Sequence, residues 1–255
     1  ALGYAEADPT ADVGGYDAAQ KAAILASLAF HTLVPAEAVY REGITDITLE
    51  QVVAARKAGY VVKLLAICEL RDDPQTGAPG VLARVHPALI PLAHPLAAVH
   101  GANNAIFVEA EAAGPLMFYG AGAGGIQTAS AVLGDVVSAA RRHVVGGPGV
   151  AESTHADLPV LPISAATTRY QISMTVADEP GVLATVAGIL QQHGVSVETI
   201  QQTVSEAGTS GAVGEATLVI GTHEAVEADL AATVAALSNS SVVTAVTSVL
   251  RGEGL

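Results

Sequence analysis

Six segments with two different hydrophobic periods follow one another between residues 169 and 250, and their order limits the possible folds more than any other feature. Strands are expected over residues 169–176, 195–204, 211–220 and 242–250, and helices over 180–192 and 223–237. Pro180 suits a first helical turn, Gly194 suits a helix end, and Thr222 is expected to open the second helix. The order βαββαβ predicts a ferredoxin-like unit.

The preceding residues predict a second sheet. Thr48 and Gln51 form a capping box, so a helix should begin there and end at about Ala58, before Gly59. Apolar or alternating strands are expected over residues 60–70, 81–92, 105–111 and 116–119, the first two joined as a hairpin. These segments predict a mixed or antiparallel sheet with helices on one face. The fold class is therefore α+β.

Glycine and proline are frequent over residues 143–166, which are typical of a linker. We expect a first domain over residues 1–143, a linker over 144–166 and a second domain over 167–255. The chain opens without Met in the middle of a motif, so we expect an upstream portion to be missing.

Composition excludes several classes of partner. Acidic residues outnumber basic ones by 25 to 11, which disfavours binding to nucleic acid or to an anionic membrane. No signal peptide is visible, and the longest apolar runs are interrupted by charges and prolines. The single Cys68 cannot form an internal disulfide, and it fits a reducing cytoplasm.

An acidic stretch near the start of the chain is the candidate reaction site. Glu6, Asp8 and Asp12 are expected on an irregular loop, because Pro9 and a Gly-Gly pair interrupt any helix there. Asp17 is placed to cap or open the helix that follows, and it lies four residues before Lys21 on one face. Solvated surface is one interpretation. The other is a polar pocket in which the lysine donates a proton.

A glycine run over residues 120–125 satisfies Gly-x-Gly-x-x-Gly between a strand and a helix expected over 126–142. It is not the dinucleotide fingerprint, because two arginines stand where an acid should follow a second parallel strand. The glycines either let a ligand approach the helix N-terminus or make a tight turn for packing. His86 and His94 are eight residues apart without a third ligand nearby, so no metal site is expected.

The acidic stretch resembles homoserine dehydrogenases, whose pattern is Gly-Tyr-x-Glu-x-Asp-Pro-x-x-Asp-x-x-Gly-x-Asp-x-x-x-Lys, matched from Gly3 to Lys21. The resemblance implies hydride transfer between a nicotinamide cofactor, NADP or NAD, and aspartate 4-semialdehyde, giving homoserine in threonine, methionine and isoleucine biosynthesis. It implies that Lys21 is the acid/base with Asp17 beside it. Substrate-site residues implied in the same way are Tyr4, Glu6 and Asp12.

The glycine run and its helix also resemble that family, whose pattern Gly-x-Gly-Ala-Gly-x-x-x-Thr-Ala-x-Ala-Val-x-x-Asp is matched over residues 120–135. The resemblance implies that Gly122, Ala123 and Gly124 lie near the cofactor, with Thr128 a weaker candidate. It also implies that the first sheet forms a dimer interface, and that the cofactor's main binding domain lies upstream. Residues 1–255 alone are therefore expected to show no turnover.

The first turn of the second unit resembles an ACT domain, a small module that binds amino acids. Asp178 could take an ammonium group, and Gly181, with Val182 and Leu183 after it, could let a carboxylate reach the helix start. An ordinary turn is the alternative. The resemblance implies threonine as feedback ligand, and a homodimer or homotetramer through paired ACT edges. Two functions remain open: an oxidoreductase portion, or an amino-acid-sensing assembly protein without catalysis of its own.

Overall fold

The computed structural model describes residues 8–146, 153–204 and 214–254. Over these residues the α-helices are α1 (Thr10–Val13), α2 (Tyr16–Phe30), α3 (Leu49–Lys57), α4 (Gly125–Val145), α5 (Val182–Gln192) and α6 (Glu227–Ser238). The strands are β1 (Tyr40–Arg41), β2 (Tyr60–Asp72), β3 (Pro79–Pro91), β4 (Asn103–Ala110), β5 (Gly114–Ala121), β6 (Thr167–Ala177), β7 (Val197–Val204), β8 (Glu215–Thr222), β9 (Ala225–Val226) and β10 (Val243–Gly252).

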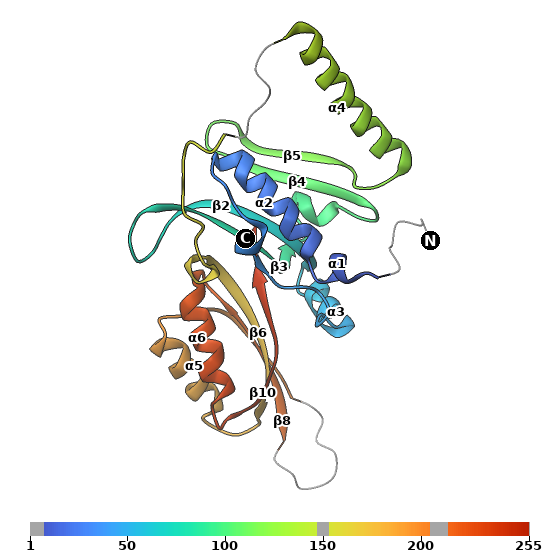
Figure 1. Ribbon diagram of the computed structural model, residues 1–255. Helices are drawn as coiled ribbons and strands as arrows, with labels where there is room; N and C mark the ends of the chain where they lie inside the picture. The colour runs from blue at the N-terminus through green and yellow to red at the C-terminus, as the bar shows by residue number, and fades with distance from the viewer. Residues whose placement is uncertain (1–7, 147–152, 205–213, 255) are drawn as a thin grey trace.

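One sheet runs through both halves of the described chain. Its order is β1-β3-β10-β6-β8-β7, with β2 antiparallel to the whole of β3. The second half contributes the antiparallel strands β10, β6, β8 and β7, with α5 and α6 on one face, as the ferredoxin-like prediction requires (Figure 1). In Figure 1, β10 (red) runs from this second half toward β3. The two units therefore share hydrogen-bonded strands.

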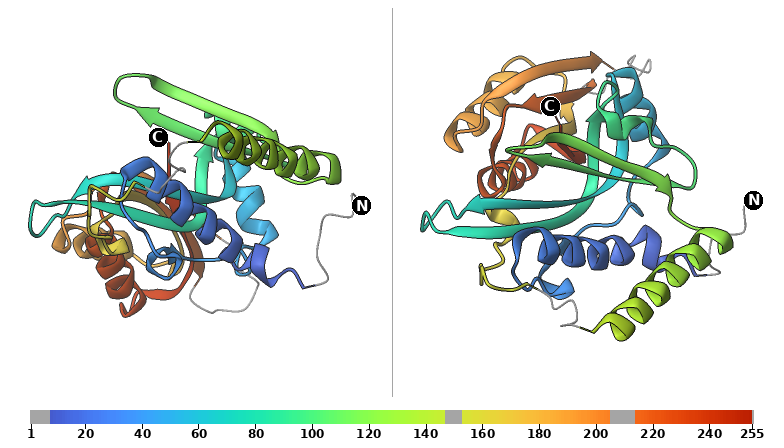
Figure 2. Two further views of the ribbon diagram at one scale, coloured as in Figure 1. Left: turned by 45° about the horizontal axis from the view of Figure 1, so that its top comes forward. Right: turned by 90° about the horizontal axis from the view of Figure 1, so that it is seen from above.

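The hairpin of β4 and β5 departs from the prediction of one common sheet. The two strands pair antiparallel with each other, from Asn103 opposite Ala121 to Ala110 opposite Gly114, and form a separate two-stranded sheet. One edge of β3 is occupied by β2 and the other by β1 and β10, so no place on β3 is left for the hairpin. Figure 2 shows the hairpin standing away from the β2–β3 ribbon, on the side of α4.

Helix α2 packs on the β2–β3 pair through a stripe of alanines. Ala19, Ala22, Ala23 and Ala26 are all buried, and they lie at the spacing of one helical face. Side chains this small let the helix backbone come close to Val81, Ala83 and Val85 of β3. The position of α2 is therefore defined by contact with the sheet, while its other face carries exposed Ile24 and Leu28.

Residues 153–166 of the expected linker pack on the first sheet through their apolar residues, whereas Val144 and Val145 are exposed at the end of α4. The amide of Val81 donates to the carbonyl of Pro159, and the amide of Leu161 donates back to Val81, both at 2.8 Å. Leu161 and Ala166 are buried against Leu82. Sequence periodicity missed this packing because the contacts are formed by single apolar residues between prolines. Residues 153–166 therefore belong to the folded body.

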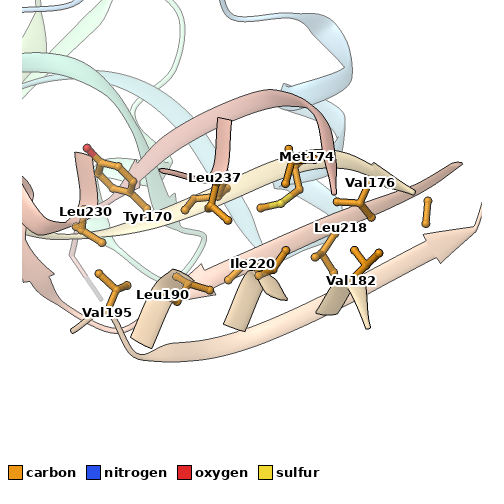
Figure 3. Close-up of a cluster of buried hydrophobic side chains, with 14 residues drawn as sticks. Tyr170, Met174, Val176, Val182, Leu190, Val195, Leu218, Ile220, Leu230 and Leu237 are labelled. Carbon is orange, nitrogen blue, oxygen red and sulfur yellow. The ribbon is translucent and has the colours of Figure 1, made fainter. Parts of the chain in front are cut away.

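The second half has its own apolar core between its sheet and α5 and α6 (Figure 3). Two predicted helix starts are wrong by a few residues. Helix α5 begins at Val182, with Pro180 in the preceding turn, and α6 begins at Glu227 rather than His223. Thr222 does not open α6, because it ends β8 and its hydroxyl accepts a hydrogen bond from the Tyr170 amide. Residues 211–213, expected in a strand, lie outside the described residues.

Helix α4 stands apart from the rest of the described chain (Figure 1). None of its residues within the described ranges is buried, and Ile126 is 84% exposed. Its exposed apolar residues also include Val132, Leu133, Val136 and Val137. No helix in the part of the chain that the structure describes is both long and apolar enough to cross a membrane.

Candidate functional site

The acidic stretch is more ordered after Asp8 than predicted. The Asp8 carboxylate accepts hydrogen bonds from the Thr10 hydroxyl at 2.6 Å and the Thr10 amide at 3.0 Å. These two bonds stabilise the carboxylate and lower the pKa of Asp8. They precede the single turn of α1, which includes Asp12, so the irregular loop expected through Asp12 is wrong at this point. Tyr4 and Glu6 lie outside the described residues.

Asp17 and Lys21 are brought together as predicted, on the first turns of α2. Lys21 Nζ lies 2.6 Å from Asp17 Oδ2, and the two side chains are 56% and 47% exposed. Asp17 does not cap the helix with its side chain; the N-cap is Gly15, whose φ of 76° is left-handed. The carboxylate lies in the first turn, where the helix dipole favours negative charge. Among the described acids, Asp17 is the one that pairs with Lys21.

Arg41 was not predicted, and it contacts the turn that precedes α2. Its Nη1 donates to the carbonyl of Gly14, and its guanidinium lies over the Tyr16 ring, 3.6 Å from the centroid. Next to it, a Cβ on Gly43 would lie 2.5 Å from the Val13 carbonyl oxygen. The two segments are 27 residues apart in the chain, so no local pattern could have revealed their contact.

The glycine run leaves main chain uncovered at the N-terminus of α4. Gly124 is the N-cap with φ of 137°, and a Cβ on Gly122 would lie 2.1 Å from Asn104 Nδ2. Position 124 therefore needs glycine for its backbone conformation, and a side chain at position 122 would displace Asn104. Ala123 is exposed, and the Thr128 amide already donates to the Gly124 carbonyl at 2.9 Å. A flat ring or an anion can approach the exposed main chain at Gly122 and Ala123, with the Asn104 and Gln127 side chains beside it, so the residues fit a nicotinamide cofactor.

The predicted regulatory turn has mixed surroundings. Asp178 and Gly181 are exposed, and Gly181 is the N-cap of α5 in a left-handed conformation, with φ of 94°. Leu183 is 42% exposed, whereas Val182 is buried in the core of the second half. Val182 could therefore contribute its main chain to a ligand but not its side chain.

A buried ionic cluster that sequence reasoning missed lies beside β3. Arg84 is fully buried between Glu69 of β2, at 3.0 Å, and Glu253, at 3.1 Å. His86 is buried next to them, with Nδ1 3.0 Å from the Pro87 carbonyl and Nε2 3.6 Å from Glu253. Burial is the main cause that lowers the pKa of His86 to about 3. His94 instead accepts a hydrogen bond from the Leu96 amide and caps a short 3-10 helix.

A second buried cluster surrounds Arg251 at the end of β10. Its guanidinium lies 2.6 Å from Glu227 and 2.7 Å from Glu42, and the Tyr170 hydroxyl donates to Glu227 at 2.7 Å. Burial alone would lower the pKa of Arg251, but the bonds to Glu227 and Glu42 outweigh it and raise that pKa. The sequence signal for this cluster is an arginine in an otherwise apolar strand. Its partners Glu227 and Glu42 are 24 and 209 residues away, so the sequence does not identify them.

Comparisons with known proteins agree with this arrangement. Residues 1–137 match the family model of homoserine dehydrogenase, and residues 170–239 match that of the ACT domain. A homoserine dehydrogenase of Mycobacterium tuberculosis is 57% identical over 256 residues, which are 100% of this chain and 57% of that protein. One of Corynebacterium glutamicum is 54% identical over 252 residues, 99% of this chain and 55% of that protein.

Solved structures give the same result. A homoserine dehydrogenase from Thiobacillus denitrificans superimposes with a TM-score of 0.88 at 37% identity, over 99% of this chain and 56% of that one. The S. aureus homoserine dehydrogenase at pH 7.5 superimposes with a TM-score of 0.67 at 29% identity, over 100% of this chain and 57% of that one. The chain thus spans little more than half the length of its relatives. With its catalytic-type unit and its ACT domain, the chain belongs to the homoserine dehydrogenase family.

Proposed function

We propose that this chain is the catalytic and regulatory portion of an NAD(P)-dependent homoserine dehydrogenase, which interconverts aspartate 4-semialdehyde and homoserine. The observation that carries the proposal is the Lys21–Asp17 pair at 2.6 Å, on a helix held against the sheet by buried alanines. Family membership and the complete motif over residues 3–21 support it. The isolated 255 residues are expected to be inactive, because the nucleotide-binding part falls in the portion of the relatives that they do not cover.

Lys21 is proposed as the acid/base at the substrate oxygen. A lysine amine is protonated near neutral pH, so it can donate a proton to the alkoxide that forms as the carbonyl is reduced. In the opposite direction the amine must first lose its proton, and its neutral form then accepts the hydroxyl proton of homoserine. Asp17 orients the amine through their hydrogen bond and keeps a compensating charge beside it.

Tyr4, Glu6 and Asp12 are proposed to bind the substrate. Carboxylates suit the ammonium group that both homoserine and the semialdehyde carry. Asp12 is exposed on α1, directly before the turn that leads into the helix that carries Lys21, so its carboxylate is accessible to a ligand from solvent. Their contribution would be orientation of the reacting carbon rather than chemistry.

Gly122, Ala123 and Gly124 are proposed to lie against the nicotinamide end of NADP or NAD. When bound, the cofactor supplies or accepts the hydride. The main chain at these three residues would support the ring and help to exclude water, while Gly124, the N-cap of α4, adopts the positive φ with which the helix begins.

The ACT domain is proposed to bind an amino acid, with threonine as the first candidate. Asp178 would pair with the ligand ammonium, and the amides following Gly181 would donate hydrogen bonds to its carboxylate. Residues 167–255 are proposed as this regulatory domain, after a catalytic domain over 1–143 and a connection over 144–166. Strand β7 is at one end of the sheet order, and edge pairing through it would lead to a homodimer or homotetramer.

The test uses the full-length enzyme that contains this chain, with homoserine oxidation followed by nicotinamide absorbance. Replacing Lys21→Ala should lower kcat by about 10²–10⁴-fold, the usual contribution of a general acid/base. The matched control is Gln20→Ala, an exposed neighbour on the same helix, which should keep kcat within about twofold.

A Lys21→Ala enzyme with full kcat would refute the proton-transfer role. A full-length protein that oxidises no homoserine with either cofactor but binds threonine would favour the amino-acid sensor instead.

A further inference from the structure

Two strands from different domains lie end to end along one edge of β3. Strand β1 of the catalytic unit is parallel to β3, with Tyr40 opposite Arg84 and Arg41 opposite Val85. Three residues further along β3, the end of β10 pairs with the same edge, also in parallel, with Arg251 opposite Ala88 and Gly252 opposite Leu89. The ACT domain therefore reaches the catalytic unit at the point where the chain leaves β1.

The junction between these two strands is closed by charged side chains. Glu42, the residue after β1, lies 2.7 Å from Arg251 Nη1, and the Tyr40 hydroxyl donates to the same carboxylate oxygen at 3.2 Å. Arg251 also holds Glu227, the first residue of α6, at 2.6 Å. Through Arg251, Glu42 is thus linked to β10, which carries this arginine, and to α6, which begins at Glu227.

The opposite side of the same short segment holds the turn before α2. Arg41 donates to the Gly14 carbonyl and stacks on Tyr16, while the Ile44 amide donates to the Val13 carbonyl at 2.8 Å. Alternate residues of an extended chain face opposite ways, which is why Arg41 and Glu42 can contact different partners. We call residues 40–44 the bridge segment.

We propose that the bridge segment sets the position of α2 relative to the ACT domain, with Arg41 as a positioning residue for Lys21. The inference rests on the proposed function, because it needs Lys21 to be the acid/base. Arg41 acts on the Gly14 main chain and the Tyr16 ring, at the end of the helix that carries Lys21 in its second turn. It does not act on the substrate.

The expected effect is on the chemical step. Lys21 is half-exposed and α2 begins in a Gly-Gly turn, so the bridge segment restrains the turn before the helix, in addition to the packing of Ala19 on the sheet. Misplacing a reacting group by about 1 Å can cost roughly 10²-fold in rate. Gly122 and Gly124 lie between β5 and α4, and the side chains nearest to them, Asn104 and Gln127, are outside the bridge segment, so cofactor binding should be unaffected.

The experiment compares four full-length enzymes: wild type, Arg41→Ala, Glu42→Gln and the control Arg169→Ala. Arg169 lies opposite Gly252 of β10, but its side chain pairs with Glu198 at 3.0 Å and Glu224 at 3.8 Å, and not with Glu42 or Arg41. Arg41→Ala should lower kcat for homoserine by about 10–100-fold, with the cofactor KM within about twofold. Glu42→Gln should lower kcat by about 3–10-fold, and Arg169→Ala by less than about twofold.

Amide hydrogen exchange provides the second measurement. Exchange over residues 10–21 should be faster in Arg41→Ala and in Glu42→Gln than in wild type and Arg169→Ala. Glu42→Gln is expected to fold, because Arg251 keeps the Glu227 carboxylate as a counter-charge. The proposal is overturned if Arg41→Ala keeps the wild-type kcat and exchange. The proposed link from the bridge segment to the ACT domain is overturned if Glu42→Gln behaves like Arg169→Ala in both kcat and exchange.

The two hypotheses fail differently. If wild type oxidises no homoserine, the proposed function fails, whereas the exchange comparison still decides whether the bridge segment holds α2.

Discussion

Arg84, His86 and Glu253 show how a polar cluster is kept inside this protein. Arg84 and His86 are fully buried, and the carboxylates of Glu69 and Glu253 provide the charge that compensates the guanidinium. A buried arginine without such partners would be strongly destabilising. His86 is the member of the cluster that stays neutral, because burial makes its charged form unfavourable.

This neutral histidine predicts a specific pH dependence of stability. In the unfolded chain His86 binds a proton below about pH 6.5, whereas in the folded protein its pKa is about 3. Between these values the unfolded state binds more protons, so stability falls as pH falls, by at most about 1.4 kcal/mol per pH unit. From pH 7 to pH 5, urea unfolding should show wild type losing about 2 kcal/mol more than His86→Gln. Equal losses in both proteins would contradict the buried neutral state.

Local side-chain chemistry could be predicted from the sequence, and distant pairing could not. The Lys21–Asp17 pair follows from a four-residue spacing on a helix, and it is present. Arg84 pairs with Glu253, which is 169 residues away in the sequence, and Arg41 donates to the carbonyl of Gly14, which is 27 residues away. Asp17 was expected to cap or open the helix, but Gly15 is the N-cap, because its left-handed backbone precedes a helix that begins at Tyr16, one residue before Asp17.

At the scale of single elements, α3 is the clearest agreement between sequence and structure. The Thr48 hydroxyl accepts from the Gln51 amide at 3.2 Å, and the Gln51 side chain accepts from the Thr48 amide at 2.8 Å, as the capping box predicted. Every group involved lies within four consecutive residues. The β4–β5 hairpin is the opposite case, because its separation from the main sheet depends on which strands occupy the edges of β3.

The cap predicts a measurable loss. Thr48→Ala leaves the Gln51 amide without its partner and should lower the free energy of unfolding by about 1 kcal/mol. Thr45→Ala, in the exposed loop just before the helix, is the matched control and should change it by less than about 0.5 kcal/mol. Chemical denaturation of both variants distinguishes them. A Thr48→Ala protein as stable as the control would show that the cap contributes nothing.

At the scale of the whole molecule, the ACT domain and the catalytic unit form one hydrogen-bonded body. The ACT family match covers residues 170–239, and β10 (Val243–Gly252), which follows it, pairs with both β6 of the matched region and β3. Sequence patterns predicted both units and their order. They could not predict that the last strand of one would extend the sheet of the other, because hydrophobic period identifies a strand but not its neighbour.

Shared strands predict that the catalytic unit depends on the rest of the chain. A fragment of residues 1–146 would lose β10 from β3, Glu253 from Arg84 and Leu161 from Leu82, so we expect it to be aggregated by size-exclusion chromatography. A fragment of residues 153–255, which contains the complete core of Figure 3, is the control and should be monodisperse and folded. A monomeric 1–146 fragment with the thermal stability of the full chain would contradict this.

The end-to-end meeting of β1 and β10 also has a consequence for protein engineering. A chimera that grafts a foreign sensory module onto this scaffold would need more than a compatible tether. The last strand of the incoming module would have to extend beyond its own sheet, pair with β3 and place an arginine beside Glu42. Module exchange at this joint is therefore a matter of matching backbone register.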